Sequence, residues 1–202
     1  MKTSSITEQL LAKAYNFQTY TELIEKLFSE GRTTNEDNTE GMLNYTKMNM
    51  QRSSRWEKRG QINEDLISVL KNLAKDQIWL VITEGWCGDA AQILPFINKM
   101  ADSSDRIELK LILRDQHPEV MDEFLTDGSR SIPKVVILDK QTLEVLGSWG
   151  PRPKVIHSEY IQKVRDENYE NTKAAEELHL WYARDKGKTT QQEFKDFLES
   201  LN

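Results

Sequence analysis

The chain has 202 residues, of which 38% are hydrophobic, so it can form one domain of ordinary size with an extension. It carries 27 basic and 33 acidic residues, a net charge of −6, and the basic residues form no run. We therefore expect neither nucleic acid nor an anionic membrane surface as a partner. No apolar run approaches the roughly 18 residues of a membrane span, and the N-terminus is too polar for a signal peptide. These features predict a cytoplasmic protein.

Residues 1–75 have the pattern of a helical extension with three helices. The first is expected to follow Thr19 and Glu22, which have the spacing of a capping box. The second and third are expected at residues 42–56 and 63–76, where apolar residues recur at helical spacing. Because three modest helices bury little surface on their own, we expect this extension to pack on the remaining chain and share its core.

Strands begin at "IWLVIT", residues 78–83, a short apolar run rich in β-branched residues that suits a strand buried on both faces. The later segments alternate between helical and strand patterns in the order βαβαββ, which predicts an α/β fold. The predicted strands after the first lie at 106–115, 134–139 and 144–149, with helices from 88 to about 102 and around 116–125.

Two helical segments are expected after the last strand. Pro153 is placed to open a long helical segment that reaches about Asp185. A final helix is expected to start at Thr190, which forms a capping-box pattern with Glu193.

Cys87 is the only cysteine of the chain and lies in "TEGWCGDAAQ", between a predicted strand and a predicted helix. A thiol at a helix N-terminus is exposed to the positive end of the helix dipole, which favours the reactive thiolate. Free cysteine is also among the most buried residue types, and a lone buried cysteine is usually inert. The flanking Gly85, Trp86 and Gly88 are typical of a surface corner, and the reactive and inert interpretations both stay open.

The pattern resembles the thioredoxin family over about Ile78 to Leu201. Trp86 and Cys87 follow the first core strand, a helix begins at the cysteine, and Ile132-Pro133 precedes a hairpin and the C-terminal helices. The motifs "WCGDA" and "WGPRP" look most similar to those of a group of bacterial thioredoxin-like proteins, and here the motif has a single cysteine. The resemblance implies a thioredoxin-like domain over residues 76–202, with a mixed central sheet flanked by helices.

Within the family, Cys87 would be the catalytic nucleophile, and Ile132 and a cis Pro133 would dock the backbone of the substrate beside Trp86. Two departures weaken an enzymatic interpretation. The position of the second, resolving cysteine is Ala90, and the buried acid of the first strand is replaced by Val81. A mixed disulfide at Cys87 would therefore need an external thiol, such as glutathione as a co-substrate.

Two functional hypotheses follow from these residues. In the first, the protein is a monothiol-type thiol-disulfide oxidoreductase acting on a protein thiol or disulfide. In the second, it is a redox-inactive interaction module that binds a protein partner. The three histidines have no metal-ligand spacing and no phosphate-binding glycine loop occurs, so we expect no metal and no bound cofactor. Asp89 is interpreted as an ordinary helix-stabilising acid of the first turn.

Overall fold

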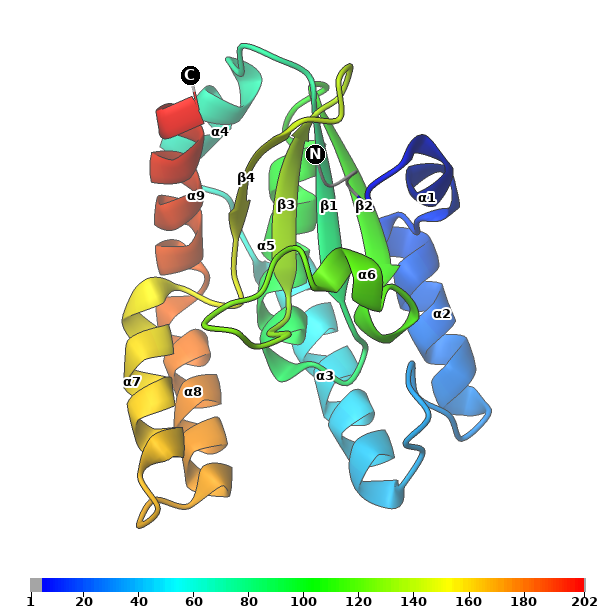
Figure 1. Cartoon of the computed structure of the whole chain (residues 1–202). Helices are drawn as coiled ribbons and strands as arrows, with labels where there is room; N and C mark the ends of the chain where they lie inside the picture. Colours follow the sequence, from blue (N-terminus) through cyan, green and yellow to red (C-terminus); the bar gives the residue numbers. More distant parts are fainter. Residues whose placement is uncertain (1–4, 202) are drawn as a thin grey trace.

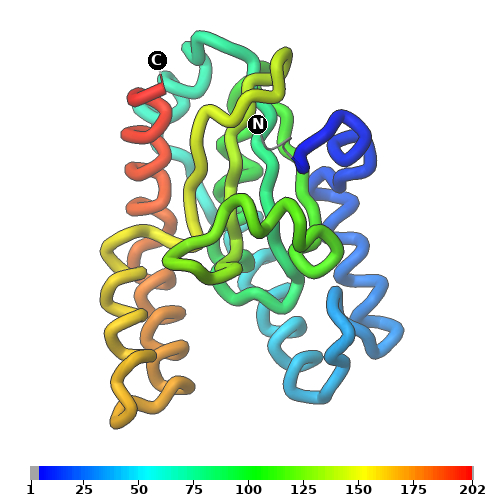
Figure 2. Tube along the Cα trace, viewed as in Figure 1, coloured from blue at the N-terminus to red at the C-terminus, as the bar shows by residue number. Residues whose placement is uncertain are grey.

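The structure is a computed structural model, and it describes residues 5–201 (Figures 1 and 2). Helices and strands alternate through the central part of the chain, and helices alone form the two ends. In the described residues, no helix has both the length and the apolar character that a bilayer span requires. The elements in chain order are α1 (Glu8–Lys13), α2 (Phe17–Ser29), α3 (Glu40–Arg59), α4 (Glu64–Lys71), β1 (Gln77–Thr83), α5 (Gly88–Asp102), β2 (Ile107–Leu113), the 3-10 turn η1 (Arg114–Gln116), α6 (Pro118–Met121), β3 (Lys134–Asp139), β4 (Val145–Trp149), α7 (Lys154–Arg165), α8 (Asn171–Asp185) and α9 (Lys188–Leu201).

A four-stranded mixed sheet with the order β2-β1-β3-β4 forms the centre of the fold. β1 is parallel to β2 and antiparallel to β3, and β3 is antiparallel to β4. In the register, Val81 lies between Leu111 and Val135. Every residue of β1 is buried, which explains why its sequence is a continuous apolar run instead of an alternating one. The predicted α/β fold with a mixed sheet flanked by helices is confirmed.

The helices from the two ends of the chain lie at opposite edges of this sheet. Figure 1 shows α1 and α2 beside β2, and α7, α8 and α9 on the side of β4. Tyr15, between α1 and α2, forms an antiparallel bridge to Leu111 of β2. α3 packs along α5, and α4 packs along α9. The N-terminal helices therefore contact both α5, which follows β1, and α9, which follows the sheet.

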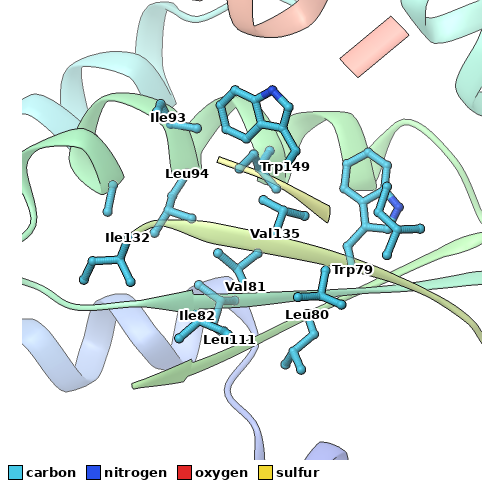
Figure 3. Packing of buried hydrophobic residues seen from close by; sticks show 14 of the residues in the cluster. Trp79, Leu80, Val81, Ile82, Ile93, Leu94, Leu111, Ile132, Val135 and Trp149 are labelled. Atoms are coloured by element: carbon cyan, nitrogen blue, oxygen red, sulfur yellow. The ribbon is translucent and has the colours of Figure 1, made fainter. Parts of the chain in front are cut away.

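In residues 5–201, most of the buried apolar side chains belong to one large cluster. Figure 3 shows Val81, Leu111 and Val135 from three strands together with Leu94 of α5. Side chains of the N-terminal helices, such as Leu70 of α4, belong to the same cluster. The predicted division of the chain near residue 75 stays a prediction, but the helices before it pack on the rest of the chain, α2 on β2, α3 on α5, and α4 on α9 and α5.

The N-terminal segment differs in detail from the prediction. Within residues 5–75 the structure has four helices instead of three, because α1 forms ahead of the predicted first helix. The capping box exists, but Asn16 is its cap and Thr19 its third helical residue, so the helix begins before Thr19. Thr19 and Glu22 share a capping spacing by chance, since Asn16 is an equally good cap with an earlier start.

The C-terminal prediction also needs correction. The expected long segment is two helices, α7 and α8, separated at residues 166–170. α9 begins at Lys188, before the predicted start, and Thr190 is buried inside it. Glu193 does not cap this helix, because its carboxylate accepts hydrogen bonds from Trp149 Nε1 (2.8 Å) and the Lys154 backbone N–H (2.7 Å).

Candidate active site at Cys87

Cys87 is the N-cap residue of α5, directly after the turn that follows β1. Its Sγ donates a hydrogen bond to the backbone oxygen of Ile132 at 3.3 Å. The peptide bond between Ile132 and Pro133 is cis. The fold thus brings together three of the four residues that the sequence nominated, although they are far apart in the chain.

Trp86, the fourth nominated residue, is half-buried and lies next to Cys87 in the chain. The guanidinium of Arg114 stacks over its ring at 4.8 Å from the centroid. Its indole Nε1 is buried, and within the described residues it has no hydrogen-bond partner. Trp149, the other tryptophan next to a strand end, is a buried core residue packed on Phe194.

The thiol of Cys87 is protected from solvent, and the residue is only 7% exposed. Burial, together with a smaller contribution from the negative charge of Asp89, raises the pKa of Cys87 to about 12. The backbone N–H groups of Ala90 and Asp89 and the charge of Arg152 act in the opposite direction. The predicted effect of the helix N-terminus is present, but burial outweighs it, so the thiol is protonated at neutral pH in this conformation.

Asp89 is a buried member of an ion pair, which the sequence analysis missed. The guanidinium of Arg152 contacts both carboxylate oxygens, with Nε at 3.0 Å from Oδ1 and Nη2 at 2.6 Å from Oδ2. The hydroxyl of Tyr182 donates to Oδ1 at 2.5 Å. Asp89 therefore fastens the first turn of α5 to the loop after β4 and to α8, beyond any stabilisation of its own helix.

Arg152 continues this network toward α7. Its guanidinium lies over the ring of Tyr160 at 4.6 Å, and Nη1 is 3.2 Å from Nδ1 of His157. The charge of Asp89 raises the pKa of Arg152 in spite of burial, so the guanidinium stays charged. The "GPRP" segment is a weak signal for this role, namely an arginine between two prolines directly after a predicted strand.

The start of α5 is covered by α3 and α8. A β-carbon on Gly88 would lie 2.8 Å from Cε1 of His179, which shows how closely α8 approaches. Nδ1 of His179 is 3.1 Å from Nε2 of Gln92, and Oε1 of Gln92 accepts from Trp56 Nε1 of α3 at 2.6 Å. Burial lowers the pKa of His179 to about 4, so this histidine is neutral at pH 7.

Glu84 is a second buried acid that the sequence analysis did not single out. It is 0% exposed and lies three residues before Cys87, whereas the expected acid position, Val81, is apolar. Its carboxylate accepts hydrogen bonds from the hydroxyl of Thr34 and from the backbone N–H of Asp115 (3.0 Å). Burial raises the pKa of Glu84 to about 7. A carboxyl group is thus present near the cysteine, but at a different position in the turn.

A cavity of about 120 Å³ lies beside Cys87, between α2, α3 and α5. Tyr20, Ile24, Glu84 and Cys87 are among its lining residues. Tyr20 contacts Oγ1 of Thr83 through its hydroxyl at 3.4 Å, and burial raises its pKa. The N-terminal helices therefore contribute one wall of the space next to the thiol.

In residues 5–201, no three His, Cys, Asp or Glu side chains are grouped so that they could hold a metal ion. The candidate site is thus a thiol, a backbone carbonyl beside a cis proline, and two buried acids. Such a set can support sulfur chemistry or peptide docking, whereas it offers no donor set for metal chemistry.

Comparisons with known proteins bear on the family and the fold of the chain. A family model described as thioredoxin matches residues 35–173, more than half of the chain. None of the curated proteins matches. A crystal structure of a protein of unknown function from Pseudomonas aeruginosa has a TM-score of 0.64 at 17% identity, covering 99% of both chains. The crystal structure of an HIV epitope scaffold has a TM-score of 0.59 at 18% identity, covering 98% of this chain and 99% of that one. At such identities the two structures show a shared fold, while the family model carries the assignment. The chain therefore belongs to the thioredoxin family.

Proposed function

We propose that this protein is a single-cysteine thiol-disulfide exchange protein that acts through Cys87. The observation that carries the proposal is the position of Sγ at the start of α5, 3.3 Å from the Ile132 carbonyl and beside the cis bond to Pro133. A peptide that pairs with the backbone of Ile132 would present its sulfur directly to the thiol. Trp86 would line the same surface as a docking residue.

The exchange step balances with one cysteine on this chain. The Cys87 thiolate attacks one sulfur of a disulfide, a new S–S bond forms, and the other sulfur leaves as a thiolate that takes up a proton. Because residue 90 is alanine, no second thiol of the chain can resolve this mixed disulfide. An external thiolate such as that of glutathione would attack the substrate sulfur bound to Cys87, so that a disulfide forms between glutathione and the substrate and Cys87 leaves as a thiolate that takes up a proton.

The closed arrangement of the site sets the expected rate. With a pKa of about 12, only a minute fraction of Cys87 is thiolate at pH 7, and the thiol is buried as well. We expect exchange to be slow in this conformation and to become faster when α3 or α8 moves away from the start of α5.

A second candidate function is a binding protein without redox turnover. The buried, protonated thiol favours it, because the thiol proton is donated to the very carbonyl that would otherwise meet a peptide substrate. In this case a protein partner would bind over the Trp86 and Ile132 surface, and Cys87 would have only a packing role.

Reaction with glutathione disulfide separates the two functions, since any adduct must lie on the single cysteine. The folded protein would be incubated at pH values from 6 to 10 and adducts measured by mass spectrometry, with Cys87→Ser as the control. We expect one glutathione per chain, with a rate that rises about tenfold per pH unit because the thiolate fraction does so. Labelling that occurs only in denaturant would leave the binding protein as the better account.

Turnover offers a second test. The native chain should fail to reduce insulin catalytically, since it lacks a resolving thiol. Ala90→Cys places a sulfur one helical turn from Cys87 and should yield an internal disulfide and measurable turnover with a dithiol reductant. The double variant Cys87→Ser/Ala90→Cys is the matched control and should be inactive. Equal activity of both variants would contradict a role for Cys87 as the attacking group.

A further inference from the structure

A cleft with a basic lining lies away from Cys87. It has a volume of about 1030 Å³ and is formed by the end of α3, the loop to α4, and the start of α9. Figure 1 shows α4 and α9 side by side, with the end of α3 leading into α4. Five cationic residues line it, and Asp65 is the one acidic residue among the described lining residues; the cations are Arg55, Arg59, Lys186, Lys188 and Lys195.

Within the part of the chain that the structure describes, four of these cations have no carboxylate partner. Among the ion pairs of residues 5–201, none includes Arg55, Arg59, Lys186 or Lys188, and all four side chains are exposed. Lys195 has only a long contact of 4.0 Å with Glu199. The chain has more acids than bases, so partners of opposite charge are abundant elsewhere. Because these cations lack neutralising carboxylates, the cleft has a concentrated positive potential.

The walls of the cleft are fastened to each other by hydrogen bonds. The Gln191 amide on α9 donates to the Gln61 carbonyl at 3.1 Å and accepts from the Asn63 backbone N–H at 2.8 Å. The Gly60 N–H donates to the Trp56 carbonyl at 2.7 Å. Trp56 and Leu66 line the cleft as buried side chains, and the ring of Trp56 also carries the guanidinium of Arg55 at 4.8 Å. The cleft is therefore preformed, as small-molecule sites usually are.

We propose that this cleft binds a small polyanion with at least two phosphate groups. The arginines come from α3, and the lysines come from the corner between α8 and α9 and from α9 itself, so a compact ligand can be reached from several walls at once. Arginine offers paired N–H donors that match phosphate oxygens, and the side-chain amide of Gln192 has a second hydrogen besides the one it donates to Asp196. A nucleic acid would need a basic stripe along the surface instead of opposed walls, and the net charge of −6 opposes it.

Calorimetric titration of the full chain with sodium tripolyphosphate tests the proposal. We expect saturable binding of one ligand per chain that weakens as salt is added. The double variant Arg59→Glu/Lys188→Glu should bind at least tenfold more weakly. Lys26→Glu/Lys47→Glu makes the same charge change at exposed positions outside the cleft and should change the affinity less than threefold.

Controls for folding and for the identity of the ligand accompany this titration. Circular dichroism would establish that each variant is folded, and the milder Arg59→Gln should also weaken binding if the double variant unfolds. Adenosine triphosphate in place of tripolyphosphate identifies the source of the phosphates: tighter binding indicates a nucleotide, and equal or weaker binding indicates a phosphate chain alone. Equal losses in the two double variants, or no saturable binding by the native chain at low salt, would overturn the proposal. Cys87→Ser should bind normally, because the cleft does not include the thiol.

Discussion

Cys87 is held between two opposing influences whose sizes decide the protonation state of its sulfur. A helix N-terminus stabilises a negative charge by about 0.3–1 kcal/mol at an exposed position. A rise of the Cys87 pKa from 9.0 to about 12 corresponds to about 4 kcal/mol against the thiolate. The helix start is therefore not enough to make a reactive thiol when the same turn is buried and carries the charge of Asp89.

Replacing Asp89 with asparagine should destabilise the protein strongly. The variant leaves the buried guanidinium of Arg152 without its carboxylate, which typically costs about 3–5 kcal/mol. The same change removes a negative charge beside Cys87 and should lower its pKa. Urea denaturation measures the first effect, and the pH dependence of thiol alkylation measures the second.

Asp102→Asn is the matched control, because Asp102 is an exposed acid at the end of the same helix. It should change the free energy of unfolding by less than about 0.5 kcal/mol. Similar losses in the free energy of unfolding for Asp89→Asn and Asp102→Asn would show that the buried ion pair does not contribute the expected stability.

Glu84 should make stability depend on pH in a direction unusual for an acid. Its pKa of about 7 in the folded state exceeds the ordinary 4.5, so the native state holds a proton that the unfolded state has released between these values. The stabilisation is therefore complete below pH 4.5 and is lost as the pH rises through 7, by about 3 kcal/mol. Glu84→Gln keeps the hydrogen-bond acceptor and should abolish this loss.

The measurement is the difference between the unfolding free energies of Glu84→Gln and the native chain from pH 4.5 to 8. The difference should move in favour of the variant as the pH rises. His179, whose pKa is lowered to about 4, has the opposite slope, but it is present in both proteins and cancels. Parallel profiles for the two proteins would rule out a buried, protonated Glu84.

At the scale of elements, the start of α5 is held between α3 and α8. Gly88→Ala should destabilise the protein by about 1–3 kcal/mol, because its new β-carbon would lie 2.8 Å from the ring of His179. Gly41→Ala in α3 is the control, since no atom lies within 4 Å of its β-carbon, and it should stabilise by up to about 1 kcal/mol. Thermal unfolding of both variants checks the prediction. If Gly88→Ala is stabilising, His179 and α8 shift away from α5 at little cost, and the prediction is wrong.

The sequence predicted the elements that depend on local pattern and missed those that depend on distant partners. The apolar run of β1 was recognisable from the residues themselves, because a buried strand has a short local pattern. The cis bond at Ile132-Pro133 and its place beside Cys87 were expected only from the resemblance to the thioredoxin family, because most X-Pro bonds are trans. The pairing of Asp89 with Arg152 joins residues 63 positions apart, so no local pattern reveals it. Glu193 matched a capping pattern, but Trp149 and Lys154 compete for its carboxylate in the folded chain.

At the scale of the whole molecule, the N-terminal helices and the sheet form one hydrophobic cluster. Removal of residues 1–75 would expose the surface that Tyr20, Leu66 and Leu70 bury. We expect residues 76–202 alone to lack a cooperative urea transition, measured by circular dichroism. Limited proteolysis of the full chain that releases a stable, folded fragment of residues 1–75 would contradict this shared core.

The bridge between Tyr15 and Leu111 also bears on how the protein behaves at high concentration. β2 is an edge strand, and unpaired backbone groups on such an edge invite pairing with another molecule. Tyr15 occupies both backbone groups of Leu111, with N–O distances of 2.9 and 2.7 Å, and α2 lies along the same edge. The segment between α1 and α2 therefore covers part of this edge. We expect it to hinder pairing of β2 with the sheet of another molecule, whatever the state of the Cys87 thiol.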